Sequence, residues 1–161
     1  MPAQILIYAA FGAFIAYFSS DPDYTHLPPE VAVITLSFSH AGERATPCRK
    51  LSAEEIARLA ANMRRAEQCP RGRVDVVVEL DLDGETLYRA SLAPAGLARD
   101  GASTALERFV VSAGRHSLRA RLRDSRRADG FDYELEETVE LEPGRNVVLD
   151  FRADTGGFTL L

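Results

Sequence analysis

The stretch VDVVVELDLDGETLYRASL, residues 74–92, decides the fold of this chain. Apolar residues recur at every second position on both sides of Asp83-Gly84, as they do in strands that bury one face. An Asp-Gly pair between two such runs is a strong signal for a two-residue hairpin turn. We therefore predict strands over residues 74–82 and 86–92, joined as a β-hairpin.

The same period of two continues along the rest of the chain. The further strands that it predicts cover residues 31–39, 105–112, 115–123, 133–141 and 146–152. Ala113-Gly114 separates one pair of them, and a Glu-Pro-Gly-Arg turn at residues 142–145 separates another. Residues 157–161 are expected to add a short strand or to cap the core. About seven strands at this spacing indicate a mostly β fold, an immunoglobulin-like antiparallel β-sandwich.

One helix is predicted as an insertion in the sandwich, over residues 52–67. Ser52 and Glu55 have the spacing of a capping box, in which each side chain accepts a hydrogen bond from a free backbone N–H at the helix start. The apolar residues that recur at helical spacing are Ile56, Leu59, Ala60 and Met63. We expect this stripe to pack on the sheet; the alternative is that it binds a partner.

Cys48 and Cys69 bracket this helix and are the only two cysteines. An even number of cysteines suggests a disulfide in an oxidising compartment. A helix over residues 52–67 would be about 24 Å long, whereas a disulfide requires Cα atoms within about 7 Å of each other. We expect a Cys48–Cys69 disulfide, provided that the preceding segment runs back along the helix or that the helix ends early, near Met63.

Residues 3–18, AQILIYAAFGAFIAYF, contain no charged side chain. Their length lies at the lower limit for a membrane-spanning helix. A cleaved signal peptide usually has a basic start and a small-x-small cleavage site, which are missing here, and a buried core helix is the third interpretation. We expect an anchor at 1–20, a linker with three prolines at 21–30 and the domain at 31–161. The small residues expected to pack against another membrane helix are Ala9, Gly12, Ala13 and Ala16.

Basic residues near a span set its orientation, because they are retained on the cytoplasmic side. The segment after the span carries Asp21, Asp23 and Glu30, and its first basic residue is Arg44. This favours export of the C-terminal domain. We therefore expect a single-pass protein of the cytoplasmic (inner) membrane, with its N-terminus in the cytoplasm and its domain in the periplasm of a Gram-negative host.

No catalytic motif, metal motif or phosphate-binding loop stands out in the sequence. His26, His40 and His116 lie far apart, and the two cysteines lack C-x-x-C spacing. The formal charge of −5 also argues against general nucleic-acid binding, which usually needs a basic surface. We expect no catalytic residue, no metal, no cofactor and no nucleic-acid partner, and a chain that is not an enzyme.

Two predicted strands carry opposite charges on one face. The arginines in question are Arg119, Arg121 and Arg123, and the glutamates are Glu134, Glu136 and Glu140. If the strands pair, the two rows face each other and form a solvated surface of weak ion pairs. The loop between them, residues 124–131, is the first place where we expect contact with a partner, because loops on a rigid scaffold often carry function. The residues expected to make that contact are Arg123, Arg126, Arg127 and Phe131.

These features together favour a non-catalytic role. An anchor followed by a sandwich is the layout of accessory and assembly subunits of bacterial membrane complexes, such as respiratory complexes, which is an argument by analogy. We expect the anchor to contact the lipid bilayer and integral membrane protein subunits, and the sandwich to bind the outer face of the partner. The alternatives are a free-standing periplasmic module that binds a ligand, glycan or metal, and an enzyme.

Overall fold

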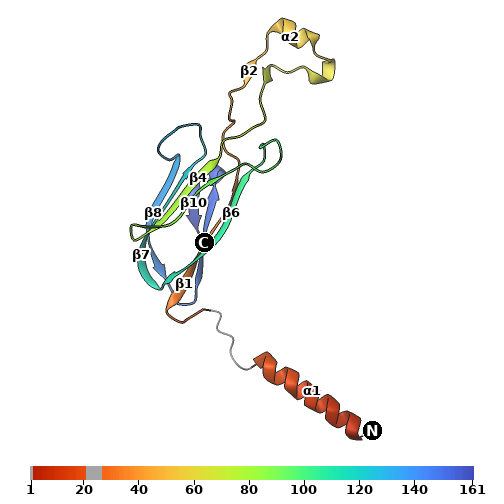
Figure 1. Ribbon diagram of the computed structural model, residues 1–161, viewed down its shortest axis with the longest axis vertical. Coiled ribbons are helices and arrows are strands. Elements are labelled where there is room, and N and C mark those ends of the chain that lie inside the picture. The colour runs from red at the N-terminus through yellow and green to blue at the C-terminus, as the bar shows by residue number, and fades with distance from the viewer. Residues whose placement is uncertain (1, 21–26) are drawn as a thin grey trace.

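The computed structural model describes residues 2–20 and 27–161 and shows a mostly β chain behind one N-terminal helix (Figure 1). Helix α1 spans Pro2–Ser20. The predicted linker at 21–30 falls largely on residues 21–26, which lie outside the described residues.

Within residues 27–161, ten strands and three further short helices follow α1. The strands are β1 (Val31–His40), β2 (Arg49–Lys50), β3 (Glu67–Gln68), β4 (Val76–Leu82), β5 (Glu85–Leu92), β6 (Ser103–Ser112), β7 (Gly114–Arg123), β8 (Tyr133–Leu141), β9 (Asn146–Arg152) and β10 (Gly157–Leu160). The helices are α2 (Ala53–Arg58) and the 3₁₀ turns η1 (Ala61–Met63) and η2 (Ala153–Thr155).

Eight of the strands form two four-stranded sheets, neither of which closes into a barrel. One sheet has the order β10-β9-β1-β6 and the other has the order β5-β4-β7-β8. Neighbouring strands are antiparallel except β1 and β9, which run parallel. The remaining two strands, β2 and β3, pair as a separate two-stranded ribbon.

The apolar positions of the period-two pattern meet between the two sheets. The fully buried large side chains there include Ile34, Leu36, Leu80, Leu118, Leu122 and Leu149, which come from β1, β4, β7 and β9. Each strand contributes every second residue, because successive side chains of a strand point to opposite faces. The core is therefore one apolar layer to which both sheets contribute.

All seven strands predicted from the sequence are present. The hairpin at residues 74–92 has the predicted two-residue turn, with positive φ at both Asp83 (52°) and Gly84 (84°), as a type I′ turn requires. The pattern did not predict β2 and β3, which are only two residues long and exposed. The alternative that residues 157–161 add a short strand corresponds to β10.

The prediction of a helix over residues 52–67 is wrong in length. Its start is correct, because Ser52 and Glu55 form both hydrogen bonds of the capping box. However, α2 ends at Arg58, Leu59 is extended, and only the short turn η1 follows. No residue of α2 or η1 is buried, and Met63 is 58% exposed. Short helices depend on tertiary packing of an apolar face, and this stripe does not pack on the sheet.

Helix α1 is long and apolar enough to cross a membrane. None of its apolar window is buried, which excludes a core helix of the described domain. A signal sequence near an N-terminus passes the same test of length and composition, so these properties of α1 fit either an anchor or a signal sequence. Gly12 and Ala13 lie three and four positions after Ala9 and four and three positions before Ala16 on this helix, so the four small residues share one face. Their packing against another helix stays a prediction.

Leu80→Ala tests the core. Leu80 is fully buried, so its truncation is expected to lower the free energy of unfolding by about 2–5 kcal/mol. Guanidinium titration of the full chain in detergent measures this. Leu106→Ala is the matched control, because Leu106 is 71% exposed and its truncation should change stability by less than about 0.5 kcal/mol. Equal losses in both variants would contradict the assigned core.

Candidate functional site

Residues 44–73, which we call the arm, project from one end of the two-sheet domain (Figure 1). The arm begins and ends at a bridge between Arg44 and Arg73. It continues through the β2–β3 ribbon and carries α2 and η1 at its tip. It leaves the end of the domain opposite to the start of β1, where the chain enters from residue 27.

Cys48 and Cys69 form a disulfide within the arm. The register of the ribbon pairs Arg49 with Gln68 and Lys50 with Glu67, which places the two cysteines directly opposite each other. Their Cα atoms are 4.2 Å apart, as in a pair of an antiparallel ladder that shares no backbone hydrogen bonds. The length of the helix was the objection to this disulfide, and the early end of α2 at Arg58 removes it.

The base of the arm is tied to the domain by backbone acceptors. The Arg73 side chain donates to the carbonyl oxygens of Gly42 (2.7 Å) and Asp100 (3.1 Å). Gly42 lies so close to the returning chain that a Cβ atom at this position would be 2.7 Å from the Val74 carbonyl oxygen. Only glycine allows this approach. The arm therefore has a fixed base, although no residue from 46 to 70 is buried.

The arm is basic on an acidic protein. Residues 44–73 contain eight arginines and lysines and three glutamates, whereas the rest of the chain contains 11 basic and 21 acidic residues. A hollow of about 490 Å³ beside the disulfide is lined by residues that include Arg49, Arg65 and Cys69. Arg49 is paired with Glu55 at 2.8 Å. Lys50, Arg58 and Arg65 are exposed and form no ion pair within the described part of the chain.

The loop at residues 124–131 lies at the same end of the domain and contacts the arm base. Arg126 forms an ion pair with Glu43 at 2.8 Å and lowers the pKa of that carboxyl group through this hydrogen bond. Arg123 donates to the Ala128 carbonyl oxygen at 2.7 Å, and Arg127 lies 3.1 Å from Asp132. These predicted contact residues therefore hold the shape of their own loop.

The fourth residue of that prediction, Phe131, is covered on one face. The Arg121 guanidinium lies over its ring, 4.9 Å from the centroid. A cation in this position is attracted by the ring quadrupole. The side chains of Arg126 and Arg127 are 40% and 52% exposed and can still reach a partner. The assignment of Arg123, Arg126, Arg127 and Phe131 to partner contact stays a prediction.

The predicted rows of arginine and glutamate do face each other. Strands β7 and β8 pair with Arg119 opposite Glu136 and Arg121 opposite Glu134. Sequence reasoning missed that β7 also pairs with β4 on its other side. There Glu79 and Asp81 lie 2.8 and 2.7 Å from Arg121. Both carboxylates are almost fully buried. Most of the charge on this sheet face is therefore paired within the face itself.

His116 lies in an arrangement that resembles a catalytic triad. Its Nδ1 is 2.6 Å from an Asp83 carboxylate oxygen, and its Nε2 is 3.5 Å from Ser112 Oγ. However, Nε2 is closer to the Ser112 carbonyl oxygen, at 3.0 Å. The Ser112 carbonyl oxygen is thus nearer to Nε2 than the Ser112 hydroxyl is, and this geometry favours a hydrogen bond with the carbonyl over transfer of a serine proton. His116 therefore clamps the turn at Asp83 to the turn that follows Ser112.

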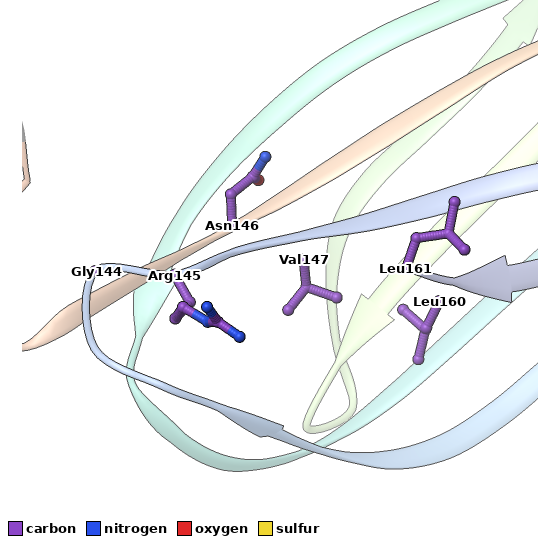
Figure 2. Close-up of a pocket in the computed structure, with 6 residues that line it drawn as sticks. All are labelled: Gly144, Arg145, Asn146, Val147, Leu160 and Leu161. Atoms are coloured by element: carbon purple, nitrogen blue, oxygen red, sulfur yellow. The ribbon is translucent and has the colours of Figure 1, made fainter.

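Two further features, a group of potential metal ligands and a hollow beside β9, have their chemical groups already engaged. Within residues 2–20 and 27–161, one group of three potential ligands is found, Cys48, Glu67 and Cys69. Its two sulfurs are joined in the disulfide, so neither is a thiolate ligand. A hollow of about 520 Å³ lies at the start of β9 and the end of β10, and Figure 2 shows the residues that line it. Its charged group, Arg145, is paired with Glu142 at 3.2 Å.

The strongest candidate site is therefore the arm. Sequence reasoning identified its disulfide but expected its helix to pack on the sheet. A count of charge over a window of about 30 residues would have identified the basic character of the arm. Comparison of the chain with protein-family models, curated proteins and solved structures gives no match.

Replacing both cysteines tests whether the disulfide orders only the arm. In Cys48→Ser/Cys69→Ser we expect amide protection at residues 49–68 to be lost, because no buried residue holds this segment. The stability of the two-sheet core should change by less than about 1 kcal/mol, since the freed arm regains in the native state much of the entropy that the disulfide removes from the unfolded state. Hydrogen exchange and denaturant titration measure the two effects. A loss of several kcal/mol in the core would show that the arm is coupled to it.

Asp83→Asn tests the His116 clamp. Hydrogen bonds from His116 and from the Ser117 N–H lower the pKa of Asp83 in the folded protein. The stabilisation by this carboxylate is therefore fully present above its unfolded pKa, about 4, and is lost as the pH falls through the lower folded pKa. Asparagine tolerates the positive φ at this position. The melting temperature of the wild type should exceed that of the variant at pH 6, and this difference should shrink between about pH 4 and pH 2. Asp129→Asn is the control and should show no difference at either pH.

Proposed function

We propose that this protein is a membrane-anchored, non-catalytic accessory or assembly subunit that binds a partner protein through its arm. Helix α1 serves as an uncleaved anchor in the cytoplasmic membrane, with the N-terminus in the cytoplasm and the β domain in the periplasm. The domain is an immunoglobulin-like sandwich that carries the arm as an insertion. The partners are integral membrane protein subunits of a bacterial complex, contacted by the anchor in the bilayer and by the domain outside it.

The observation that carries this proposal is that a disulfide closes the arm, whereas its side chains do not pack against the domain. A disulfide and an anchored base hold residues 44–73, yet residues 46–70 add no buried side chain to the domain. Ordering a segment reduces its conformational entropy, and here no core burial compensates for that loss. Contact with another surface would supply the compensation. The disulfide also supports a location in an oxidising compartment.

The charge of the arm indicates what the partner surface is like. Lys50, Arg58 and Arg65 are exposed and without carboxylate partners in the described structure. Complementary potentials at an interface steer association and select the partner. The partner therefore presents an acidic surface. Because a ten-residue strand is about 33 Å long and the arm projects beyond the far end of the sheets, that surface lies more than about 33 Å from the end at which the chain enters the domain.

Reversing the charge of the arm tests the proposal. We expect the full chain, extracted in a mild detergent, to co-purify with integral membrane proteins that mass spectrometry identifies. Arg58→Glu/Arg65→Glu should reduce their yield about tenfold or more, since a like-charge contact costs several kcal/mol at an interface.

The matched control places the same charge change at the opposite end of the domain. Arg115→Glu/Arg145→Glu alters side chains that are 78% and 72% exposed and form only surface ion pairs. This variant should retain the co-purifying proteins. A wild-type chain that always purifies alone, or equal losses in the two variants, would refute the proposal.

A further inference from the structure

Strand β6 is a sheet edge that is longer than β10 and carries fewer charged residues than β8. The two sheets end in β10, β6, β5 and β8. Natural proteins protect such edges with short strands or charged side chains, because the unpaired backbone can add a further strand. Strand β10 is only four residues long, and the nine residues of β8 include four glutamates. In contrast, β6 is ten residues long and pairs with β1 without a register shift.

The direction of the backbone groups of β6 follows from its pairing with β1. The Ala113 N–H donates to the Glu30 carbonyl oxygen at 2.9 Å, directly beyond the pair Val31–Ser112. Backbone groups alternate in direction along an antiparallel strand. Ala105, Glu107, Phe109 and Val111 therefore point their N–H and C=O groups towards β1, and Thr104, Leu106, Arg108 and Val110 point theirs away.

The other side of β1 supports this assignment. The Val33 N–H donates to Arg145 and the Val31 carbonyl accepts from Gly144, so the odd-numbered residues of β1 bond towards β9. Its even-numbered residues are left for β6. Among the described residues, no strand pairs with β6 on its outer side. The N–H and C=O groups of Leu106, Arg108 and Val110 thus form a row that a further strand could bond.

The side chains of the same residues are exposed on the outer sheet face. Leu106 is 71% and Val110 is 61% exposed, and they lie two positions to either side of Arg108. A hollow of about 210 Å³ beside them is lined by Leu27, Val33, Arg108 and Val110. One residue type therefore fits each outward position of an added strand: apolar opposite Leu106, acidic opposite Arg108 and apolar opposite Val110.

We propose that β6 binds an extended segment of a partner protein as a fifth strand of its sheet, and that this segment carries the alternating pattern apolar, x, acidic, x, apolar. The backbone row gives the affinity and Arg108 selects the acidic residue. Because this pattern is symmetric about its acidic residue, it is the same for a segment that runs parallel or antiparallel to β6. This inference rests neither on the arm nor on the membrane anchor.

A second copy of the chain fits this edge less well. A two-fold axis perpendicular to the sheet pairs residues of the same face. The two symmetric registers of greatest overlap place Glu107 opposite Glu107 or Arg108 opposite Arg108. Like charges directly opposite each other destabilise a strand pair. A segment of a different protein, with an acidic residue at this position, avoids that repulsion.

A charge-swap experiment tests this inference. The probes are two fluorescent, end-capped peptides, Thr-Val-Thr-Asp-Thr-Val-Thr and the same peptide with Lys in place of Asp, titrated onto the full chain in detergent. The wild type should bind the Asp peptide about fivefold more tightly than the Lys peptide, and Arg108→Glu should reverse this preference. The Asp peptide should slow amide exchange at Leu106, Arg108 and Val110, while Glu107 and Phe109 are protected with or without it.

A backbone variant separates strand addition from other binding. Leu106→Pro removes an outward N–H but leaves the hydrogen bonds to β1, so it should abolish binding of the Asp peptide. If that variant fails to fold, the charge swap and the exchange pattern still decide. Equal binding of both peptides to wild type and Arg108→Glu, or no binding at all, would overturn the inference. If the chain forms a dimer and Arg108→Glu changes the stability of that dimer, the occupant of β6 is a second copy and the inference is overturned. The inference does not depend on the partners that bind the arm, so their loss in the arm variant does not bear on it.

Discussion

The apolar layer between the two sheets is the interaction on which the rest of this protein depends. It is formed by side chains that alternate along the strands, and it is continuous from β1 and β9 to β4 and β7. Burial of such side chains contributes about 25 cal/mol per Å² of apolar surface, and no other part of the described domain buries a comparable surface. The arm, the loop at residues 124–131 and the free edge of β6 are all positioned by this layer but contribute little to it.

The polar interactions have a different role, which is to hold the turns at the two ends of the domain in place. His116 and Asp83 clamp the turn regions at one end, and His40 and Asp124 form a similar pair, 2.6 Å apart, at the other end. On one outer face, Arg121 pairs with Glu79 and Asp81, and Arg89 pairs with Glu79 as well. The arm and the edge of β6 carry groups that lie outside these pairs and face solvent. The two surfaces differ in kind, since the arm offers positive charge and β6 offers backbone hydrogen-bonding groups.

Where sequence and structure agree, the signal is local. Asp83-Gly84 has the chemistry of a hairpin turn, Ser52 and Glu55 have the spacing of a capping box, and both form as predicted. The helix after Ser52 ended early because its length depended on a packing surface, which is not a local property. For the disulfide, in contrast, the obstacle expected from the sequence is absent from the structure. Sequence spacing made it look difficult, and the ribbon placed Cys48 and Cys69 directly opposite each other.

The sequence by itself determined the alternation of the strands, the turns between them and the apolar N-terminal helix, because these depend on residues that are close together in the chain. Only the tertiary structure decided which strands lie at the edges, that β1 runs parallel to β9, and that Glu79 and Asp81 reach Arg121. It also decided that the stripe from Ile56 to Met63 stays exposed. These properties depend on which segments far apart in sequence become neighbours, and that is settled by the joint packing of the two sheets.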